Sequence, residues 1–409
     1  MSDPPVNIGL VGLSGYAETV LAYILEAEDQ AQAPIRLTGV HAIDFDRHDT
    51  EVADLKRRGV ELFDSYEDLL ASSAEAVWLP VPIHLHAPFT LKALKAGKAV
   101  MCEKPAAGCV QDVDQMIRAR DEAGLPVLIG YNVLPNPSTR QLKQRLLDGC
   151  IGEIQEVVVT VAIPRALSYY GRNDWAGKCR HGGTWVMDSP PGNAFSHFVN
   201  LGLFLAGEAQ NVSAAPMAVE AELYRVNAIE NYDTASIRVT LDTGAKCLIL
   251  MTHACLEWTR PNIVLRGTQG SATWSNQSIT VESPNGPETI NPEDARILSC
   301  IRTLAHVTRN DDDPRDMTPP TLELARNPVV TVNAASEATP VIQVNKPHAM
   351  QVDSPKEGLI NTILGVESLI HHCKAHGQMF HESGLAQWSR PAGVRDGLNE
   401  YTYFAGPKL

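Results

Sequence analysis

A turn rich in small residues near the start of the chain has the composition of a phosphate-binding loop. An apolar run leads into Gly12, Ser14 and Ala17, the three positions of the dinucleotide fingerprint, of which only the first is glycine here. Backbone N–H groups of such a turn, with the N-terminus of the following helix, face a pyrophosphate. The pattern predicts a dinucleotide site that includes Gly15 and Tyr16, although an ordinary tight turn has the same composition.

An acidic residue after the second apolar run would distinguish between the two nicotinamide cofactors. Asp44 follows the run Arg36–Ile43. A carboxylate there accepts hydrogen bonds from the adenosine ribose and repels a 2′-phosphate, which favours NAD. Asp46 could take the same role, and Arg47 keeps NADP open as the cofactor.

Lys104 has the chemistry of a proton donor or acceptor. It follows a strand predicted over Ala99–Cys102, and the carboxyl end of a parallel strand borders the crevice that holds a nicotinamide ring. Partial desolvation beside a cationic ring lowers the pKa of a lysine, which suits proton transfer at a carbinol carbon. Without this context, a lysine before proline is usually a surface residue.

A polar and aromatic cluster later in the chain suits a ring that carries several hydroxyl groups. Aromatic faces and charged donors together bind sugars, and the charged donors also suit an anionic group. The alternative is a loop that folds on itself or lies at a subunit contact. The cluster comprises Tyr169, Tyr170, Arg172, Asn173, Trp175 and Lys178.

The first part of the chain alternates short apolar runs with amphipathic helical stretches. Helices predicted over Pro88–Ala96 and Val110–Ala123 are each followed by a glycine, which suits a left-handed C-cap. The alternation predicts an α/β fold, a Rossmann doubly wound parallel sheet, over residues 1–133. Its predicted strands are Val6–Val11, Arg36–Ile43, Ala76–Leu79, Ala99–Cys102 and Pro126–Ile129.

Long strand-like runs dominate after about residue 152. The runs Ala235–Leu241 and Lys246–Thr252 are joined by Asp-Thr-Gly, which has the composition of a hairpin turn. This predicts a C-terminal α+β domain over residues 134–409, with a large, mostly antiparallel open sheet that binds substrate and mediates oligomerisation. Three helices are expected to pack against that sheet, at about Pro292–His306, Pro320–Ala335 and Glu357–His376.

Composition limits the partners. The chain has 409 residues and a net charge of −14, which repels phosphate backbones, so no nucleic acid partner is expected. No apolar run approaches the roughly 18 residues that span a bilayer, so a cytoplasmic protein without membrane contact is expected. The eight cysteines include no Cys-x-x-Cys pair, which predicts free thiols. No metal site is predicted, because His371, His372 and His376 lack a completing ligand.

Three short motifs follow one another at characteristic spacing. They are Pro82 with His86, then Glu103-Lys104-Pro105 about 17 residues on, and Gly130-Tyr131-Asn132. In this order they resemble the glucose-fructose oxidoreductase, inositol dehydrogenase and rhizopine catabolism (Gfo/Idh/MocA) family. The resemblance covers residues 6–200 and is expected to extend over the whole chain. The resemblance implies a cis-proline at Pro105. It also implies that cofactor contacts include Pro82, His86, Glu103, Lys104 and Asn132.

The chain departs from the family pattern of a glycine pair, an Asp and a His four residues later. Asp188 has about the right distance from Gly182-Gly183, but His197 follows nine residues after Asp188. Asn193 precedes His197 by one helical turn, so Asp188 and Asn193 both remain candidate partners. The resemblance implies that His197 relays the proton of the substrate hydroxyl. Asn200 stands where the family often has Asp, and an amide can only bind or orient.

The resemblance implies an NAD(P)-dependent oxidoreductase that transfers hydride between nicotinamide and a carbinol carbon of a sugar, cyclitol or glycoside. Lys104 would polarise the oxygen and His197 would move its proton. A redox-neutral NAD-dependent glycosidase, which oxidises, eliminates, adds water and reduces, is an alternative. A non-catalytic dinucleotide-binding regulator is another, against which Lys104 and His197 argue. The family's habit of pairing sheet faces implies a homodimer or homotetramer.

Overall fold

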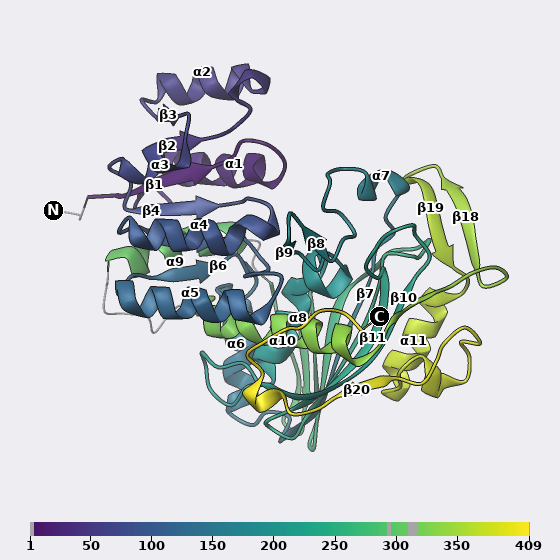
Figure 1. Cartoon of the computed structure of the whole chain (residues 1–409). Coiled ribbons are helices and arrows are strands. Elements are labelled where there is room, and N and C mark those ends of the chain that lie inside the picture. The colour runs from purple at the N-terminus through teal and green to yellow at the C-terminus, as the bar shows by residue number, and fades with distance from the viewer. Residues whose placement is uncertain (1–3, 293–295, 310–317, 409) are drawn as a thin grey trace. The chain divides into compact units, whose positions relative to one another are not determined.

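The computed structural model describes residues 4–292, 296–309 and 318–408 (Figure 1). The chain divides into two compact units. The first comprises residues 1–107, 112–137 and 293–325, and the second comprises residues 108–111, 138–292 and 326–409. The first unit is therefore discontinuous in sequence, in contrast to the simple division expected at residue 133.

The first unit contains a six-stranded sheet in which every neighbouring pair is parallel. The strand order is β3-β2-β1-β4-β5-β6, the arrangement of a doubly wound dinucleotide-binding fold. All five predicted strands are confirmed, and the three-residue edge strand β3 was missed because it has no alternation of apolar residues. The strands are β1 Val6–Val11, β2 Ile35–His41, β3 Glu61–Phe63, β4 Ala76–Leu79, β5 Ala99–Cys102 and β6 Val127–Ile129.

Helices connect these strands. The helix predicted over Val110–Ala123 has those bounds, whereas α4 begins at Ile83, five residues before the predicted start. Pro82 is its N-cap and Pro88 lies within its second turn, so the proline favoured as a helix start was the wrong one. The helices of this unit are α1 Tyr16–Asp29, α2 Asp49–Arg57, α3 Tyr66–Ala71, α4 Ile83–Lys95, most of α5 Val110–Ala123, α9 Arg296–Arg309 and the 3₁₀ turn η1 Phe45–Arg47.

Helix α9 completes the core of the first unit. Its buried residues Cys300, Ile301, Leu304 and Ala305 belong to one apolar cluster with residues of β1, β2 and α1. The prediction that this segment packs against the second sheet is therefore wrong. Its apolar stripe fits either sheet, and position along the chain does not decide between them.

The second unit contains a ten-stranded, mostly antiparallel sheet, as predicted. Only the pairs β7 with β12 and β10 with β17 are parallel. The predicted hairpin turn joins β11 to β12, and Gly244 adopts a positive φ of 83° there. The strands are β7 Ile154–Ala162, β10 Pro216–Arg225, β11 Thr234–Leu241, β12 Lys246–Thr252, β13 Thr259–Gly267, β14 Ser271–Ser275, β15 Ile279–Ser283, β16 Gly286–Ile290, β17 Val341–Gln343 and β20 Gly393–Arg395.

Both faces of the central strands are covered by helices of the same chain. On one face, α8 (Ser196–Leu205) approaches so closely that a Cβ on Gly202 would lie 2.8 Å from Val159. On the other face, α11 (Val366–His376) packs into an apolar cluster with Val158 and Leu248. Pairing between copies was expected to use exposed strand faces. In the described central strands, helices of the same chain cover those faces.

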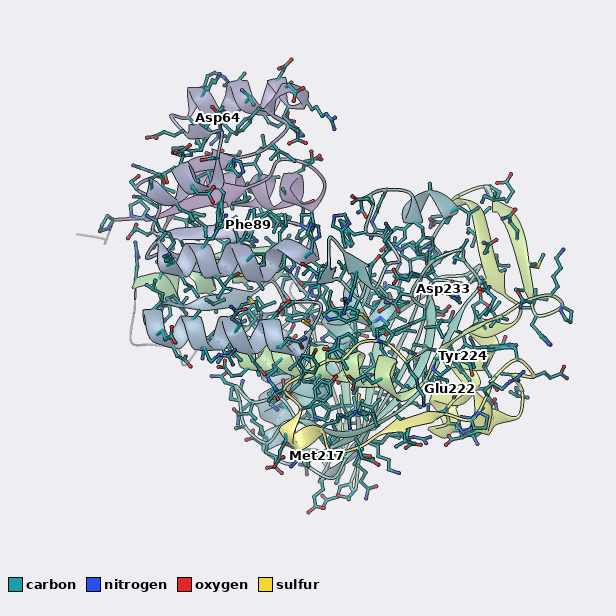
Figure 2. The ribbon with its side chains drawn as sticks, viewed as in Figure 1. Asp64, Phe89, Met217, Glu222, Tyr224 and Asp233 are labelled. Carbon is teal, nitrogen blue, oxygen red and sulfur yellow. The ribbon has the colours of Figure 1, made fainter. Side chains whose placement is uncertain are left out.

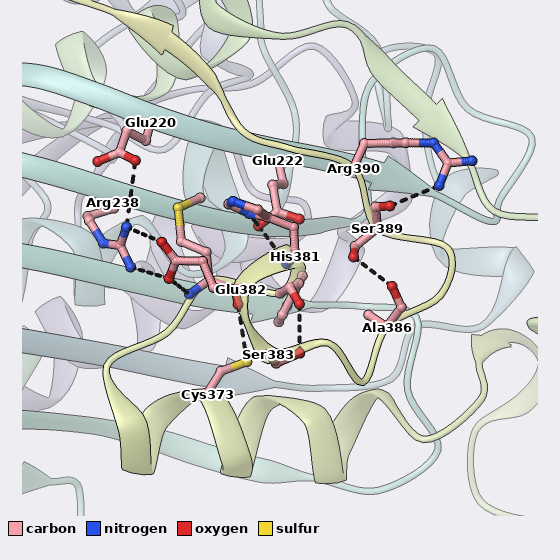
Figure 3. A network of polar contacts seen from close by, with 12 residues as sticks. Glu220, Glu222, Arg238, Cys373, His381, Glu382, Ser383, Ala386, Ser389 and Arg390 are labelled. Carbon is pink, nitrogen blue, oxygen red and sulfur yellow. Dashed lines mark hydrogen bonds and ion pairs between the residues drawn. The ribbon is translucent and has the colours of Figure 1, made fainter.

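The segment after α11 is fixed to the sheet by ion pairs (Figure 3). Arg238 of β11 donates to Glu382 at 2.7 Å, and His381 contacts Glu222 of β10 at 2.9 Å. Phe380 and Trp388 extend the apolar cluster beneath α11. Tyr224 lies on the same strand as Glu222, and both are labelled in Figure 2. The Tyr224 ring packs edge-on against Trp388.

The remaining elements of the second unit are helices, short strands and turns outside the ten-stranded sheet. The predicted helix over residues 357–376 is strand β19 followed by α11, because Gly365 in the left-handed region begins the helix. In the part of the chain that the structure describes, no helix is long and apolar enough to cross a membrane. These elements are α6 Pro137–Leu147, α7 Leu167–Tyr170, β8 Arg180–His181, β9 Thr184–Trp185, the π turn η2 Pro190–Ala194, α10 Leu322–Ala338, the hairpin β18 Ala349–Ser354 with β19 Gly358–Ile363, and the 3₁₀ turns η4 His381–Ser383 and η5 Leu398–Glu400.

A substitution that leaves a cavity in the buried face of α9 would test which sheet this helix packs against. Ile301→Ala removes a fully buried side chain, so the free energy of unfolding of the first unit should fall by about 2–5 kcal/mol. Hydrogen exchange followed by mass spectrometry should show faster exchange in β1 and β2. Arg302→Ala, on the exposed face of the same helix, serves as the control. Faster exchange confined to β7 and β12 would contradict the assignment.

Candidate functional site

The turn between β1 and α1 has the backbone shape that a pyrophosphate requires. Gly12 adopts a φ of 101°, and a Cβ there would lie 3.4 Å from the Cβ of Ala17. Gly15, with a φ of 67°, is the N-cap of α1, and its N–H donates to Glu18. The small residues at the first and third fingerprint positions thus allow the close packing of strand, turn and helix.

Asp44 is held against this turn. The Ser14 hydroxyl donates to Asp44 Oδ2 at 2.6 Å and lies 2.9 Å from His48 Nε2. The side chain of Asp44 is half-buried, while Asp46 and Arg47 are exposed. Serine at the second fingerprint position therefore links the glycine turn to the end of β2, a connection that also includes His48, which the sequence did not single out.

A buried carboxylate lies at the carboxyl end of β5. Glu103 is 6% exposed and accepts a hydrogen bond from the Trp78 indole at 3.1 Å. A Cβ on Gly130 would lie 2.6 Å from a Glu103 carboxylate oxygen, so the glycine of the third motif makes room for this side chain. Burial raises the pKa of Glu103 to about 7, although Trp78 and Lys104 oppose the shift.

His86 joins the turn after β4 to the segment after β5. Its ring is buried, with Nδ1 at 2.6 Å from the Pro105 carbonyl and Nε2 at 2.9 Å from the Val81 carbonyl. Burial lowers its pKa to about 4, although the two carbonyls that face its ring nitrogens oppose the shift. The Lys104–Pro105 peptide is cis, as the resemblance implied. His86 thereby connects the turn after β4 to Pro105, the residue after Lys104. The side chain of Lys104 itself is half-buried.

Two other predicted cofactor residues meet in the first unit. Burial and the nearby Glu103 raise the pKa of Tyr16, while a hydrogen bond with Asn132 opposes the shift. Tyr16 nevertheless keeps 43% of its surface exposed. Tyr16, Asn132 and Glu103 therefore lie together at the carboxyl edge of the parallel sheet, where dinucleotides bind in this class of fold.

In the second unit, the two rival partners of His197 are bonded to each other. Asp188 is buried and accepts hydrogen bonds from Asn193 at 2.7 Å and from the Gly177 N–H at 2.6 Å. The π turn η2 brings Asn193 back toward Asp188. His197 is the second residue of α8 and is half-buried. The inserted Ser-Pro-Pro-Gly thus forms the turn that joins Asp188 and Asn193 ahead of the histidine.

The predicted polar and aromatic cluster is brought together around Asp188 and Tyr169. The Arg172 guanidinium stacks 3.7 Å from the centre of the Tyr169 ring and 5.2 Å from that of Trp175. Tyr169 and Tyr170 contact each other edge-on, and burial raises the pKa of both.

Two members of this cluster differ in role from the rest. The Asn173 side chain accepts hydrogen bonds from the N–H groups of Trp175 and Ala176. Asn173 therefore shapes the turn, which limits its capacity to contact a ligand. Lys178 is exposed.

The sequence did not single out Arg165 or His253, which complete this cluster. His253 is buried, its ring centre lies 5.7 Å from that of Tyr169, and burial and the nearby Arg165 and Arg172 lower its pKa to about 3. Arg165 follows β7 and His253 follows β12. These strands pair in parallel, with Ala162 opposite Thr252. Both strands were predicted from the sequence, but their pairing, which brings Arg165 and His253 together, was not.

The structure describes all eight cysteines, and none forms a disulfide. His372 and His376 stack with ring centres 4.2 Å apart, and His376 Nδ1 contacts the His372 carbonyl. Among the described residues, no three His, Cys, Asp or Glu side chains are close enough to hold a metal ion.

Two family models match most of the described chain. The model of the oxidoreductase family with an NAD-binding Rossmann fold matches residues 6–131, and the Gfo/Idh/MocA C-terminal domain matches residues 139–273. Together they cover more than half of the sequence.

Curated relatives include enzymes that act on sugars and cyclitols. A dTDP-3,4-didehydro-2,6-dideoxy-alpha-D-glucose 3-reductase from Actinomadura kijaniata is 32% identical over 161 residues, 39% of this chain and 46% of that protein. The inositol 2-dehydrogenase of Rhizobium meliloti is 23% identical over 53% of this chain and 62% of that protein. The chain thus spans about half the length of the first curated relatives that it matches.

Solved structures share the fold. A 3-ketoreductase from Actinomadura kijaniata in complex with NADP superimposes with a TM-score of 0.66 at 20% identity, over 83% of this chain and all of that chain. The WlbA dehydrogenase from Bordetella pertussis in complex with NADH and UDP-GlcNAcA gives a TM-score of 0.64 at 22% identity, over 80% and 94% of the two chains.

The buried carboxylate generates a pH test. Because Glu103 titrates at about 7 in the folded protein and near 4.3 in an unfolded chain, its ionisation opposes folding. The free energy of unfolding should therefore fall as pH rises from about 5 to 8. Glu103→Gln keeps an acceptor for Trp78 and should flatten this dependence, with a difference of up to about 3 kcal/mol at pH 8. Urea unfolding at both pH values measures it.

The control for this test is Glu61→Gln, at an exposed position of β3. It should leave the pH dependence as in the unchanged protein. The same slope for Glu103→Gln and the unchanged protein would show that Glu103 ionises normally in the fold.

Proposed function

Because the chain belongs to the Gfo/Idh/MocA family of oxidoreductases, we propose that it transfers a hydride between a nicotinamide cofactor and a carbinol carbon of a sugar, cyclitol or glycoside. The observation that carries the proposal is the arrangement after β5, where Lys104 lies between buried Glu103 and the His86-bound Pro105. A regulator that only binds a dinucleotide would need no lysine held in this way.

The residues of the first unit fit a dinucleotide. The turn of Gly12, Ser14 and Gly15 would hold the pyrophosphate, since a side chain at Gly12 would crowd Ala17. Asp44 would accept hydrogen bonds from the adenosine ribose, which favours NAD over NADP. Remaining cofactor contacts are assigned to Tyr16, Ala17, Pro82, Glu103, Lys104 and Asn132. Bound nicotinamide would supply the hydride acceptor.

Lys104 and His197 divide the proton chemistry in this proposal. The Lys104 amine donates a hydrogen bond to the substrate oxygen, so that negative charge on that oxygen is stabilised as the hydride leaves the carbon. His197 accepts the hydroxyl proton, with the bonded pair of Asp188 and Asn193 orienting it. His86 acts as a positioning residue, because both of its ring nitrogens face backbone carbonyls.

The second unit supplies the substrate contacts. Tyr169, Trp175 and Arg172 present aromatic faces and a guanidinium, which suit a polyhydroxylated ring. Tyr170, Asn173 and Lys178 support this segment or lie at its edge. The cytoplasmic location, the absence of nucleic acid and membrane partners, and the homodimer or homotetramer remain predictions. The covering of β7 and β12 by α11 requires that copies pair through another surface.

Redox-neutral chemistry is the second candidate. A 2,7-anhydro-N-acetylneuraminate hydratase from Escherichia coli K12 aligns over 318 residues at 24% identity, 76% of this chain and 75% of that protein. In such a reaction the hydride removed from the sugar returns to it, so no net NADH accumulates. Release of an aglycone or addition of water without net change in NADH would identify this outcome.

Lys104→Ala should reduce turnover by about 10²–10⁴-fold while NAD(H) binding changes only a few-fold, because the amine acts on the substrate oxygen. Turnover is measured by nicotinamide absorbance on a panel of sugars and cyclitols, and binding by fluorescence titration. Lys95→Ala, on an exposed face of α4, is the control. Retained turnover in Lys104→Ala would exclude the proposed role.

Asp44→Ala should weaken NAD binding by about tenfold, since the acceptor for the ribose hydroxyls is lost. The ratio of the affinities for NAD and NADP should fall as well. Asp46→Ala is the matched comparison, because Asp46 is exposed on η1 and Asp44 is held by Ser14. Calorimetric titration with both cofactors distinguishes the two carboxylates. A larger effect of Asp46→Ala would transfer the ribose contact to that residue.

A further inference from the structure

Two guanidinium groups lie on one tyrosine ring in the second unit. The Cζ of Arg172 is 3.7 Å from the centre of the Tyr169 ring, and the Cζ of Arg165 is 4.6 Å from the same centre. The backbone N–H of Arg165 donates to the His253 carbonyl at 3.2 Å, which fixes the start of this side chain beside the end of β12. The parallel pairing of β7 and β12 thus holds Arg165 beside His253, and the two cations meet on the Tyr169 ring.

The negative charge near these cations is already engaged. Asp188 lies 3.5 Å from Arg172, but it also accepts the shorter bonds from Asn193 and Gly177. Within residues 4–292, 296–309 and 318–408, the Arg165 side chain forms no ion pair, and its Nε is buried without a hydrogen-bond acceptor. Of the two guanidinium groups, only that of Arg172 contacts this carboxylate.

The other titratable groups near these arginines are held by partners of their own. Asp233, labelled in Figure 2, accepts hydrogen bonds from Val226, Asn227 and Thr234, and burial raises its pKa. His253 stays neutral near pH 7, because burial and the two arginines lower its pKa to about 3. Arg165 is therefore a half-buried guanidinium that lacks an ion-pair partner among the described residues.

We propose that Arg165, together with Arg172, binds an anionic group of the substrate, a carboxylate or a phosphate. A guanidinium presents paired donors that match the two oxygens of such a group. Tyr169 and Trp175 then offer aromatic surface to the ring that carries the anion. The inference rests on the proposed function, in which residues 169–178 contact the substrate, and it narrows the substrate class to sugar acids or sugar phosphates.

Arg172 also has a structural role, and Arg165 is therefore the residue to change. Arg172 donates to the Tyr169 carbonyl at 2.7 Å and contacts Asp188, so its removal would disturb the turn itself. Arg165→Met keeps an apolar stem against Tyr169 and removes only the charged donors. Arg165→Lys keeps the charge without the paired donors.

The experiment measures binding of matched anionic and neutral ligands to the full chain with NAD present. Calorimetric titrations use pairs such as D-glucuronate and D-glucose for the carboxylate, and D-glucose 6-phosphate and D-glucose for the phosphate, extended to other sugar acids and phosphates with their neutral counterparts. At least one anionic member should bind about tenfold more tightly than its neutral counterpart, and added salt should weaken that preference. The pair that shows it identifies the anion.

Arg165→Met should remove most of this roughly tenfold preference, and Arg165→Lys should keep part of it. Arg180→Met is the matched control, because Arg180 stacks 3.5 Å from the Trp185 ring but is exposed to solvent. It should leave the preference unchanged. No preference for any anionic member, or an unchanged preference in Arg165→Met, would overturn the inference.

The two proposals fail in different ways. Turnover of neutral sugars with no preference for their anionic counterparts would leave the proposed function standing and remove the anion site. Failure of the chain to bind either nicotinamide cofactor would remove the proposed function, while an Arg165-dependent preference for anions would still stand as a binding site of the second unit.

Discussion

The buried carboxylate of Glu103 is the constraint on which the first unit's site depends. A charge placed at the end of a buried strand needs donors and space, and both are provided locally. Trp78 of β4 supplies the donor, while Gly130 after β6 leaves the volume that the carboxylate occupies. Three neighbouring strands therefore contribute one residue each to the packing around this carboxylate. Lys104 is the next residue in the chain after Glu103. The motifs that are separate in sequence are one packed arrangement in space.

Asp188 has the corresponding role in the second unit. It accepts bonds from Gly177 and Asn193 and contacts Arg172, so one carboxylate connects the aromatic turn to the inserted π turn. Insertion of residues between Asp188 and His197 therefore did not separate the polar groups. The turn places an amide, Asn193, beside the carboxylate. The departure from the family pattern changes the identity of the group nearest to Asp188 and keeps a polar pair ahead of the histidine.

The sequence alone predicted the Rossmann sheet well, apart from β3, because its other five strands are short apolar runs between helices. It predicted the residues after β5 through motifs with fixed spacing. It missed Arg165 and His253, because their proximity depends on a parallel pairing of β7 with β12 that spacing does not reveal. It misplaced α9, since the amphipathic pattern of residues 296–309 defines which face is buried and leaves open which sheet receives it. Long-range pairing was the information that local patterns lacked.

The discontinuity of the first unit has a consequence for synthesis of the chain. Residues 1–137 leave the ribosome long before α9 does, because eight of the ten strands of the second sheet, from β7 to β16, are translated in between. Until then, the apolar side chains of β1 and α1 that pack against Ile301 and Leu304 have no cover from this helix. Domains usually fold in the order of their translation. Here the N-terminal unit can reach its final core only after most of the second sheet has been made.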